Sequence, residues 1–91
     1  MVAYLRRTNL RGAVLRRAGL NAAILDNADL SEADLTGADV GGASLHNARL
    51  VGARMLCKRL EASKLLGATY DATTEWPPGF DPAGHGLVLL G

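Results

Sequence analysis

The side chains with the most reactive chemistry in this sequence are one cysteine, Cys57, and two histidines, His46 and His85. A thiol beside an imidazole could act as nucleophile and base. The spacing offers no acid to orient His46, however, and the repeat described below puts Cys57 and His46 on different faces. Neither histidine has a partner at the short spacing typical of metal ligands. We therefore predict a surface thiol and a surface imidazole, and we assign no catalytic residue, cofactor or metal.

The charged residues form bands along the chain. The formal charge is +5 over residues 1–20, −5 over 21–40, +4 over 41–60 and −3 over 61–91, which gives a net charge of +1. A net charge this small does not indicate a nucleic acid or a membrane as partner. The basic band has only Tyr4 as a nearby base-stacking aromatic, which argues against sequence-specific nucleic-acid binding. We interpret the bands as solvated surfaces that pair with one another. The arginines are Arg6, Arg7, Arg11, Arg16 and Arg17, and the acids are Asp26, Asp29, Glu32, Asp34 and Asp39.

The composition indicates one small domain without an internal disulfide framework. The chain has 91 residues and a single cysteine, and 48% of its residues are hydrophobic although only four are Phe, Trp or Tyr. Its apolar volume therefore comes from Leu and Ala, which suits a narrow, regular interior. No apolar run has the length of a membrane span, and the first residues lack the apolar core of a signal peptide. We expect a soluble cytoplasmic protein.

The positions of Leu and Ala repeat every five residues from Ala3 to Ala72. Cut in this frame, the chain gives fourteen units, with Leu at the third position in eleven units and Ala at the first position in eleven. A step of five would carry the leucines around every face of an α-helix, and on a simple strand it would alternate them between the two sides. Within one unit the small and large residues are two apart, so a short extended piece points both inward. A chain that turns after every unit is a solenoid.

The units resemble those of the pentapeptide-repeat family, whose consensus is A(D/N)LXX. ADLSE and ADLTG, in the range 28–37, match it fully, and ADVGG nearly does. The resemblance implies an all-β fold, a right-handed quadrilateral β-helix with four units per coil, about three and a half coils and an irregular C-terminal cap. It also implies that the third-position side chains fill the interior. Those are Leu10, Leu15, Leu20, Leu25, Leu30, Leu35, Val40, Leu45, Leu50, Met55, Leu60 and Leu65.

If four units close one coil, residues twenty apart lie one above the other at the spacing of paired strands. The second-position acids then lie beneath second-position bases, and Arg6 lies beneath Asp26. We predict inter-coil ion pairs, each contributing a few tenths of a kcal/mol on an exposed surface. The pairs are Asp29 with Arg49, Asp34 with Arg54, and Asp39 with Arg59.

The last part of the chain leaves the repeat, which predicts a β-helix over residues 3–72 and a capping tail over 73–91. The tail holds all three prolines, and its pattern YD-x-x-T-x-W-P-x-G-F-D-P resembles the closing segment of cyanobacterial members of the family. We expect Trp76 and Phe80 to cover the last coil. Within the repeat, Lys58 takes an inward first position, and we expect a local distortion there.

The amino end has no such lid, so its open coil is the place where we expect a second copy to stack, or where a longer chain would continue. The sequence favours a non-catalytic structural or protein-interaction module with an unidentified protein partner and no membrane contact. The alternative is a mimic of duplex DNA that binds DNA gyrase, as some members of the family do. One acidic band flanked by basic ones is a weak match to that alternative. An enzyme would need a pocket, which a leucine-filled interior does not offer.

Overall fold

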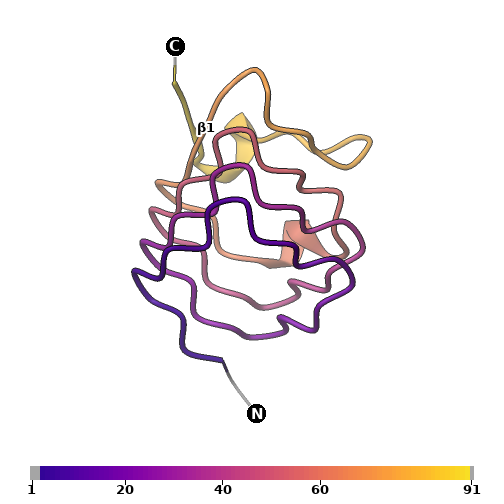
Figure 1. Cartoon of the computed structure of the whole chain (residues 1–91). Helices are drawn as coiled ribbons and strands as arrows, with labels where there is room; N and C mark the ends of the chain where they lie inside the picture. The colour runs from indigo at the N-terminus through magenta and orange to yellow at the C-terminus, as the bar shows by residue number, and fades with distance from the viewer. Residues whose placement is uncertain (1–2, 91) are drawn as a thin grey trace.

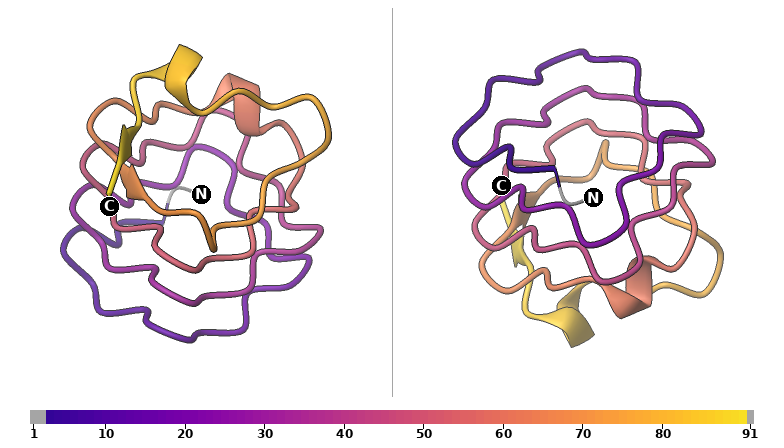
Figure 2. Two further views of the ribbon diagram at one scale, coloured as in Figure 1. Left: turned by 90° about the horizontal axis from the view of Figure 1, so that it is seen from above. Right: turned by 90° about the horizontal axis from the view of Figure 1, so that it is seen from below.

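In the computed structural model, which describes residues 3–90, the chain winds as a stack of coils from the N-terminus at the bottom of Figure 1 to the C-terminus at the top. Isolated parallel bridges join residues of adjacent coils in four columns, and most join residues twenty apart. One column, for example, runs from Tyr4 through Ile24 and Ser44 to Lys64. Viewed along the stack, the coils form a four-sided ring (Figure 2). The fold is therefore a β-solenoid, and the described residues contain no α-helix.

Each five-residue unit has one bridged residue followed by a tight turn. The fifth residue of the unit has a positive φ in most units, for example +61° at Asn27 and +75° at Gly37, and the next unit's first amide donates to the third-position carbonyl. A left-handed residue at this place is the requirement of a type II turn, which Gly and Asn meet at the lowest cost. The turn after every third-position residue is what produces the period of five.

The interior consists of the first-position alanines and the third-position apolar side chains. From Ala23 to Ala53 every such side chain is 0% exposed. Leu20, Leu60 and Leu65 are also buried, whereas Leu10 and Leu15 are only partly buried. The first coil packs against a neighbour on one side only, because the structure places nothing beneath it within residues 3–90.

Four short elements depart from the isolated bridges and turns. They are the 3₁₀ helix η1 (Leu60–Ala62), the strand β1 (Thr69–Tyr70), the 3₁₀ helix η2 (Ala83–His85) and the strand β2 (Val88–Leu89). β2 pairs with β1 in parallel, with Thr69 opposite Val88 and Tyr70 opposite Leu89. The tail therefore adds a strand above one face of the last coil.

The regular frame breaks once within the repeat, at Cys57 and Lys58. Lys58 bridges to Asp39, a separation of nineteen, and Ser44 to Lys64 restores twenty. The expectation that Lys58 points inward is wrong, because the shift places Cys57 in the interior and Lys58 on the exposed surface. Burying an unpaired ammonium would be costly, and η1 takes up the extra residue. Leu60, in η1, still fills the interior.

The tail continues the ladder before it becomes a cover. Glu75 bridges to Arg54, and the amide of Met55 donates to the Glu75 carbonyl, so backbone pairing crosses the predicted boundary between residues 72 and 73. Beyond Glu75, Trp76 and Phe80 pack against the core with their rings stacked 5.2 Å apart. Tyr70 meets the edge of Trp76, and His85 stacks on Phe80. These rings thus form one stacked cluster against the core near the carboxyl end of the chain.

Candidate functional site

The second-position acids on the outer faces serve first to hold the turns. In four units, Oδ1 of the second-position Asp or Asn accepts the amide hydrogen two residues later, and Asp71, at the fourth position of its unit, makes the same contact. At Asp34 and Asp71 a threonine hydroxyl donates to the same oxygen. This contact is an Asx-turn, in which a short polar side chain replaces a backbone acceptor. It explains physically why Asp or Asn recurs at this position, a reason that the spacing alone did not indicate. The five residues are Asn9, Asp29, Asp34, Asp39 and Asp71.

The same acids also make ion pairs, but two of the three predicted pairs are wrong. Asp39 meets Arg59 in a two-pronged contact, with N–O distances of 2.9 and 2.7 Å. Asp29 pairs instead with Arg11, at 3.8 Å. Arg11 lies in the coil below Asp29, eighteen residues earlier in the sequence.

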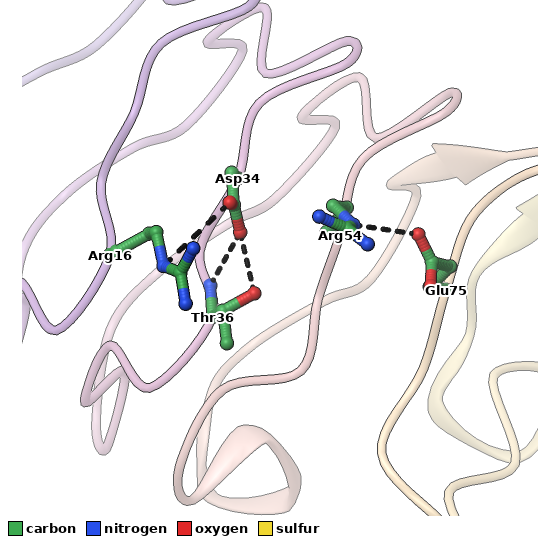
Figure 3. A network of polar contacts seen from close by, with 5 residues as sticks. All are labelled: Arg16, Asp34, Thr36, Arg54 and Glu75. Carbon is green, nitrogen blue, oxygen red and sulfur yellow. Dashed lines mark hydrogen bonds and ion pairs between the residues drawn. The ribbon is translucent and has the colours of Figure 1, made fainter.

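Figure 3 shows the third case, in which Asp34 contacts Arg16 and the hydroxyl of Thr36 while Arg54 turns to Glu75 in the coil above. The Arg54–Glu75 distance is 2.9 Å, against 3.9 Å for Arg16–Asp34. Oδ1 of Asp34 accepts from both the amide and the hydroxyl of Thr36, and Oδ2 meets Arg16 of the coil below. Arg6, predicted to pair with Asp26, makes no ion pair within residues 3–90.

Asp26 contacts Ser44 and His46 on the face above it, a cluster that the sequence analysis missed. The Ser44 hydroxyl donates to Asp26 at 2.5 Å, and Nδ1 of His46 lies 3.3 Å from that hydroxyl and 3.8 Å from the carboxylate. An acid is therefore placed near His46, contrary to our expectation. In a catalytic triad, serine and acid bind opposite nitrogens of the imidazole. Here both face Nδ1 and the serine proton points to the acid, so the cluster joins two coils and is not arranged for acyl transfer.

The prediction of a surface thiol at Cys57 is also wrong, since its side chain is buried and its Sγ donates to the Met55 carbonyl. Burial raises the pKa of this thiol to about 11, so it is protonated at neutral pH and is a poor nucleophile. A cavity of about 320 Å³ lies beside it, between η1 and the tail. Its lining residues are Cys57, Glu61, Pro77, Pro78, Gly79, Phe80, Asp81 and His85.

Two further features bear on chemistry at the surface. Within residues 3–90, no group of three or more His, Cys, Asp or Glu side chains is arranged to hold a metal ion. No helix among those residues has the length and apolar character of a membrane span.

The lower edge of the first coil is open. In the described part of the chain, the amides of Asn9, Val14 and Gly19 have no hydrogen-bond partner, whereas the corresponding amides one coil higher donate to the coil beneath them. Tyr4 and Val14, on the faces of this coil, are 75% and 76% exposed. An unpaired row of backbone groups at a sheet edge is a template for a further strand.

The turn-holding contacts predict a loss of stability in acid. Hydrogen bonds from the Ser31, Thr36 and Thr73 side chains are the largest causes that lower the pKa of Asp29, Asp34 and Asp71, and the Arg59 guanidinium lowers that of Asp39. A pKa that is lower in the folded state than the ordinary value of about 3.9 contributes stability above that value and loses it as pH falls. We expect the urea midpoint to be flat above about pH 5 and to fall below about pH 4.

The matched variants for this prediction are Asp34→Asn and Asp34→Ala. Asparagine keeps an oxygen for the Thr36 amide and removes the titration, so the fall in acid should be shallower. Alanine removes the turn contact as well and should lower the midpoint at every pH. An acid profile identical in the wild type and in Asp34→Asn would contradict the assignment.

The comparisons with known proteins agree with this architecture. The family model described as pentapeptide repeats matches eight copies over residues 3–31 and 23–55. A comparison with curated protein sequences finds no match.

Two solved structures are similar to this chain. A pentapeptide repeat protein, alr5209, from Nostoc Pcc 7120 is 28% identical, with a TM-score of 0.56 over 92% of this chain and 82% of that one. Rfr23, a pentapeptide repeat protein from the cyanobacterium Cyanothece 51142, is 34% identical, with a TM-score of 0.53. That match covers 80% of this chain, which spans 63% of the length of Rfr23. Because the repeat model covers more than half of the chain and the coils have the matching five-residue geometry, the protein belongs to the pentapeptide-repeat family.

Proposed function

We propose that this protein is a non-catalytic structural or protein-interaction module that works through its outer faces and its open first coil (residues 3–20). The observation that carries the proposal is the filled interior, in which leucine and alanine side chains leave no room for a substrate. A solenoid of this kind offers flat faces and two ends, and its free ladder edge is at the first coil. The partner we propose at that edge is a protein.

We also infer the finer geometry of the solenoid. It is a right-handed quadrilateral β-helix with about three and a half coils, capped at the carboxyl end. The four columns of parallel bridges support the square section. The right hand follows from the strong preference of parallel crossover connections for that hand.

Static light scattering at two protein concentrations, about 10 and 200 μM, tests whether a second copy stacks on the first coil. Self-association would give a molar mass that rises from the monomer toward twice that value. A mass equal to the monomer at both concentrations would rule out a homodimer through this coil. The free edge would then be left to a different protein.

The alternative of a DNA mimic that binds gyrase is not favoured by the charges. The acids of the second coil are engaged with their own turns and with arginines of the coil below. We expect no inhibition of gyrase supercoiling at micromolar protein. Inhibition that is lost when Asp29 and Asp34 are replaced by asparagine would overturn this expectation, and Glu61→Gln is the control outside the acidic coil.

A further inference from the structure

The first coil carries arginines that make no ion pair within the described residues. Arg11 pairs with Asp29 and Glu32, and Arg16 pairs with Asp34, all in the second coil (residues 21–40). Arg6, Arg7 and Arg17 make no ion pair within residues 3–90. These three arginines lie in the turns of the first coil, the coil whose Asn9, Val14 and Gly19 amides are free.

The ladder itself indicates what belongs next to such a coil. The formal charge changes sign from each coil to the next, and in one column the bridged residues of the upper coils are Asp34, Arg54 and Glu75. The bridged residues of the first coil are uncharged, and its positive charge comes from the arginines in its turns. Opposite charges on neighbouring strands stabilise a sheet, and like charges destabilise it. A strand added beneath the basic first coil is therefore favoured if it is acidic.

A second copy of this chain does not offer such a strand. Its first coil has the same charge of +5, so two first coils would repel one another. Its acidic second coil is already bonded on both edges, since the Asp34 amide donates to Ala13 below and the Leu35 amide donates to Arg54 above. At the carboxyl end, the free edge of β2 holds only Val88 and Leu89, without an acid, and Glu75, the acid in the neighbouring column, already pairs with Arg54 at 2.9 Å.

From the free edge and its charge, we propose that the first coil binds an extended acidic segment of a different protein, added as a further strand. The backbone edge supplies the pairing, and Arg6, Arg7 and Arg17 supply the selection for acids. This inference rests on the proposed function and names the chemistry of its partner.

The test uses two labelled synthetic peptides and fluorescence anisotropy. The acidic probe has the sequence of residues 21–40, the strand set that the first coil already accepts on its upper edge. The neutral probe carries Asn or Gln in place of its five acids and keeps the turn-forming oxygens. We expect saturable binding of the acidic probe, at least about tenfold weaker binding of the neutral one, and loss of the difference at high salt.

Protein variants locate the contact. A triple variant of the first coil should weaken binding of the acidic probe by about tenfold. It combines Arg6→Gln, Arg7→Gln and Arg17→Gln. The matched control removes three exposed bases elsewhere, as Arg49→Gln, Lys58→Gln and Lys64→Gln, and should leave binding unchanged. Hydrogen exchange should slow at the Asn9 and Val14 amides when the acidic probe is bound.

The outcomes separate this inference from the function on which it rests. If both probes bind equally, or the control variant loses as much as the first-coil variant, the selection for acids is wrong while strand addition stands. If neither probe slows hydrogen exchange at the Asn9 and Val14 amides, strand addition at the first coil fails, and the selection for acids fails with it. If the wild type proves to be a dimer through the first coil, the inference of a different protein is overturned.

Discussion

Replacing Leu30 with alanine is expected to lower the free energy of unfolding by about 2–5 kcal/mol. The Leu30 side chain is 0% exposed and lies in the interior of the second coil, with other coils packed on both sides. Its removal loses the transfer free energy of the deleted atoms and leaves a cavity that the paired coils cannot close. Domains of this size are stable by only about 5–15 kcal/mol, so the variant should lose a large share of its stability. Urea denaturation followed by circular dichroism measures the change.

Two controls accompany this variant. Leu30→Met conserves volume and should cost less than about 1.5 kcal/mol. Val14→Ala removes an apolar side chain that is 76% exposed and should change the stability by less than about 0.5 kcal/mol. A loss below about 1 kcal/mol for Leu30→Ala would show that Leu30 is not in a close-packed interior.

Replacing Thr74 with valine is expected to cost about 2–4 kcal/mol although the two side chains have nearly the same shape. The buried Thr74 hydroxyl donates to the Leu50 carbonyl at 2.9 Å and accepts from the amides of Gly52 and Asp71 at 3.3 and 3.2 Å. Valine would leave the Gly52 and Asp71 amides without this acceptor and would remove one of the two donors to the Leu50 carbonyl, in a site that water reaches poorly. Thr74 therefore fastens the start of the tail to the coil beneath it.

Thr74→Ser keeps the hydroxyl and removes only a methyl group, so it should retain most of the stability that valine loses. Comparison of the two midpoints in urea separates the hydrogen bonds from packing. Equal losses for serine and valine would mean that the methyl group, and not the hydroxyl, holds the tail.

The five-residue pattern predicted the solenoid because it reports two local requirements at once. Ala and Leu two apart must both face inward, and the chain must turn before the next pair. The number of units per coil came instead from the family resemblance. Four units place Leu30 above Leu10 and below Leu50, which agrees with the twenty-residue bridges between their neighbours Asn9, Asp29 and Arg49.

The surface contacts were harder to predict because register alone does not fix where a side chain points. Asp29 and Arg49 are bridged along the backbone, yet the Asp29 carboxylate is held by the Ser31 amide and meets Arg11. For the same reason, the repeat did not predict the contact of Asp26 with Ser44 and His46. Choosing among several cations requires side-chain geometry.

The register shift near Cys57 escaped the pattern for a different reason. The five-residue repeat of the sequence stays in frame after Lys58. Along the backbone, a four-residue step between the bridged residues Arg54 and Lys58 is compensated by a six-residue step from Lys58 to Lys64. Only the cost of burying the Lys58 ammonium signalled a disturbance. The shift that followed exposed Lys58 and buried Cys57.

The most direct test of the fold is a set of NMR distance contacts between backbone protons of residues about twenty apart. The solenoid predicts short contacts between the Leu30 amide and the residues around Arg49, to which it donates at 2.8 Å, and between the Asp29 amide and the residues around Thr8, at 2.9 Å. Contacts confined to residues three and four apart, as in a helix, would contradict it.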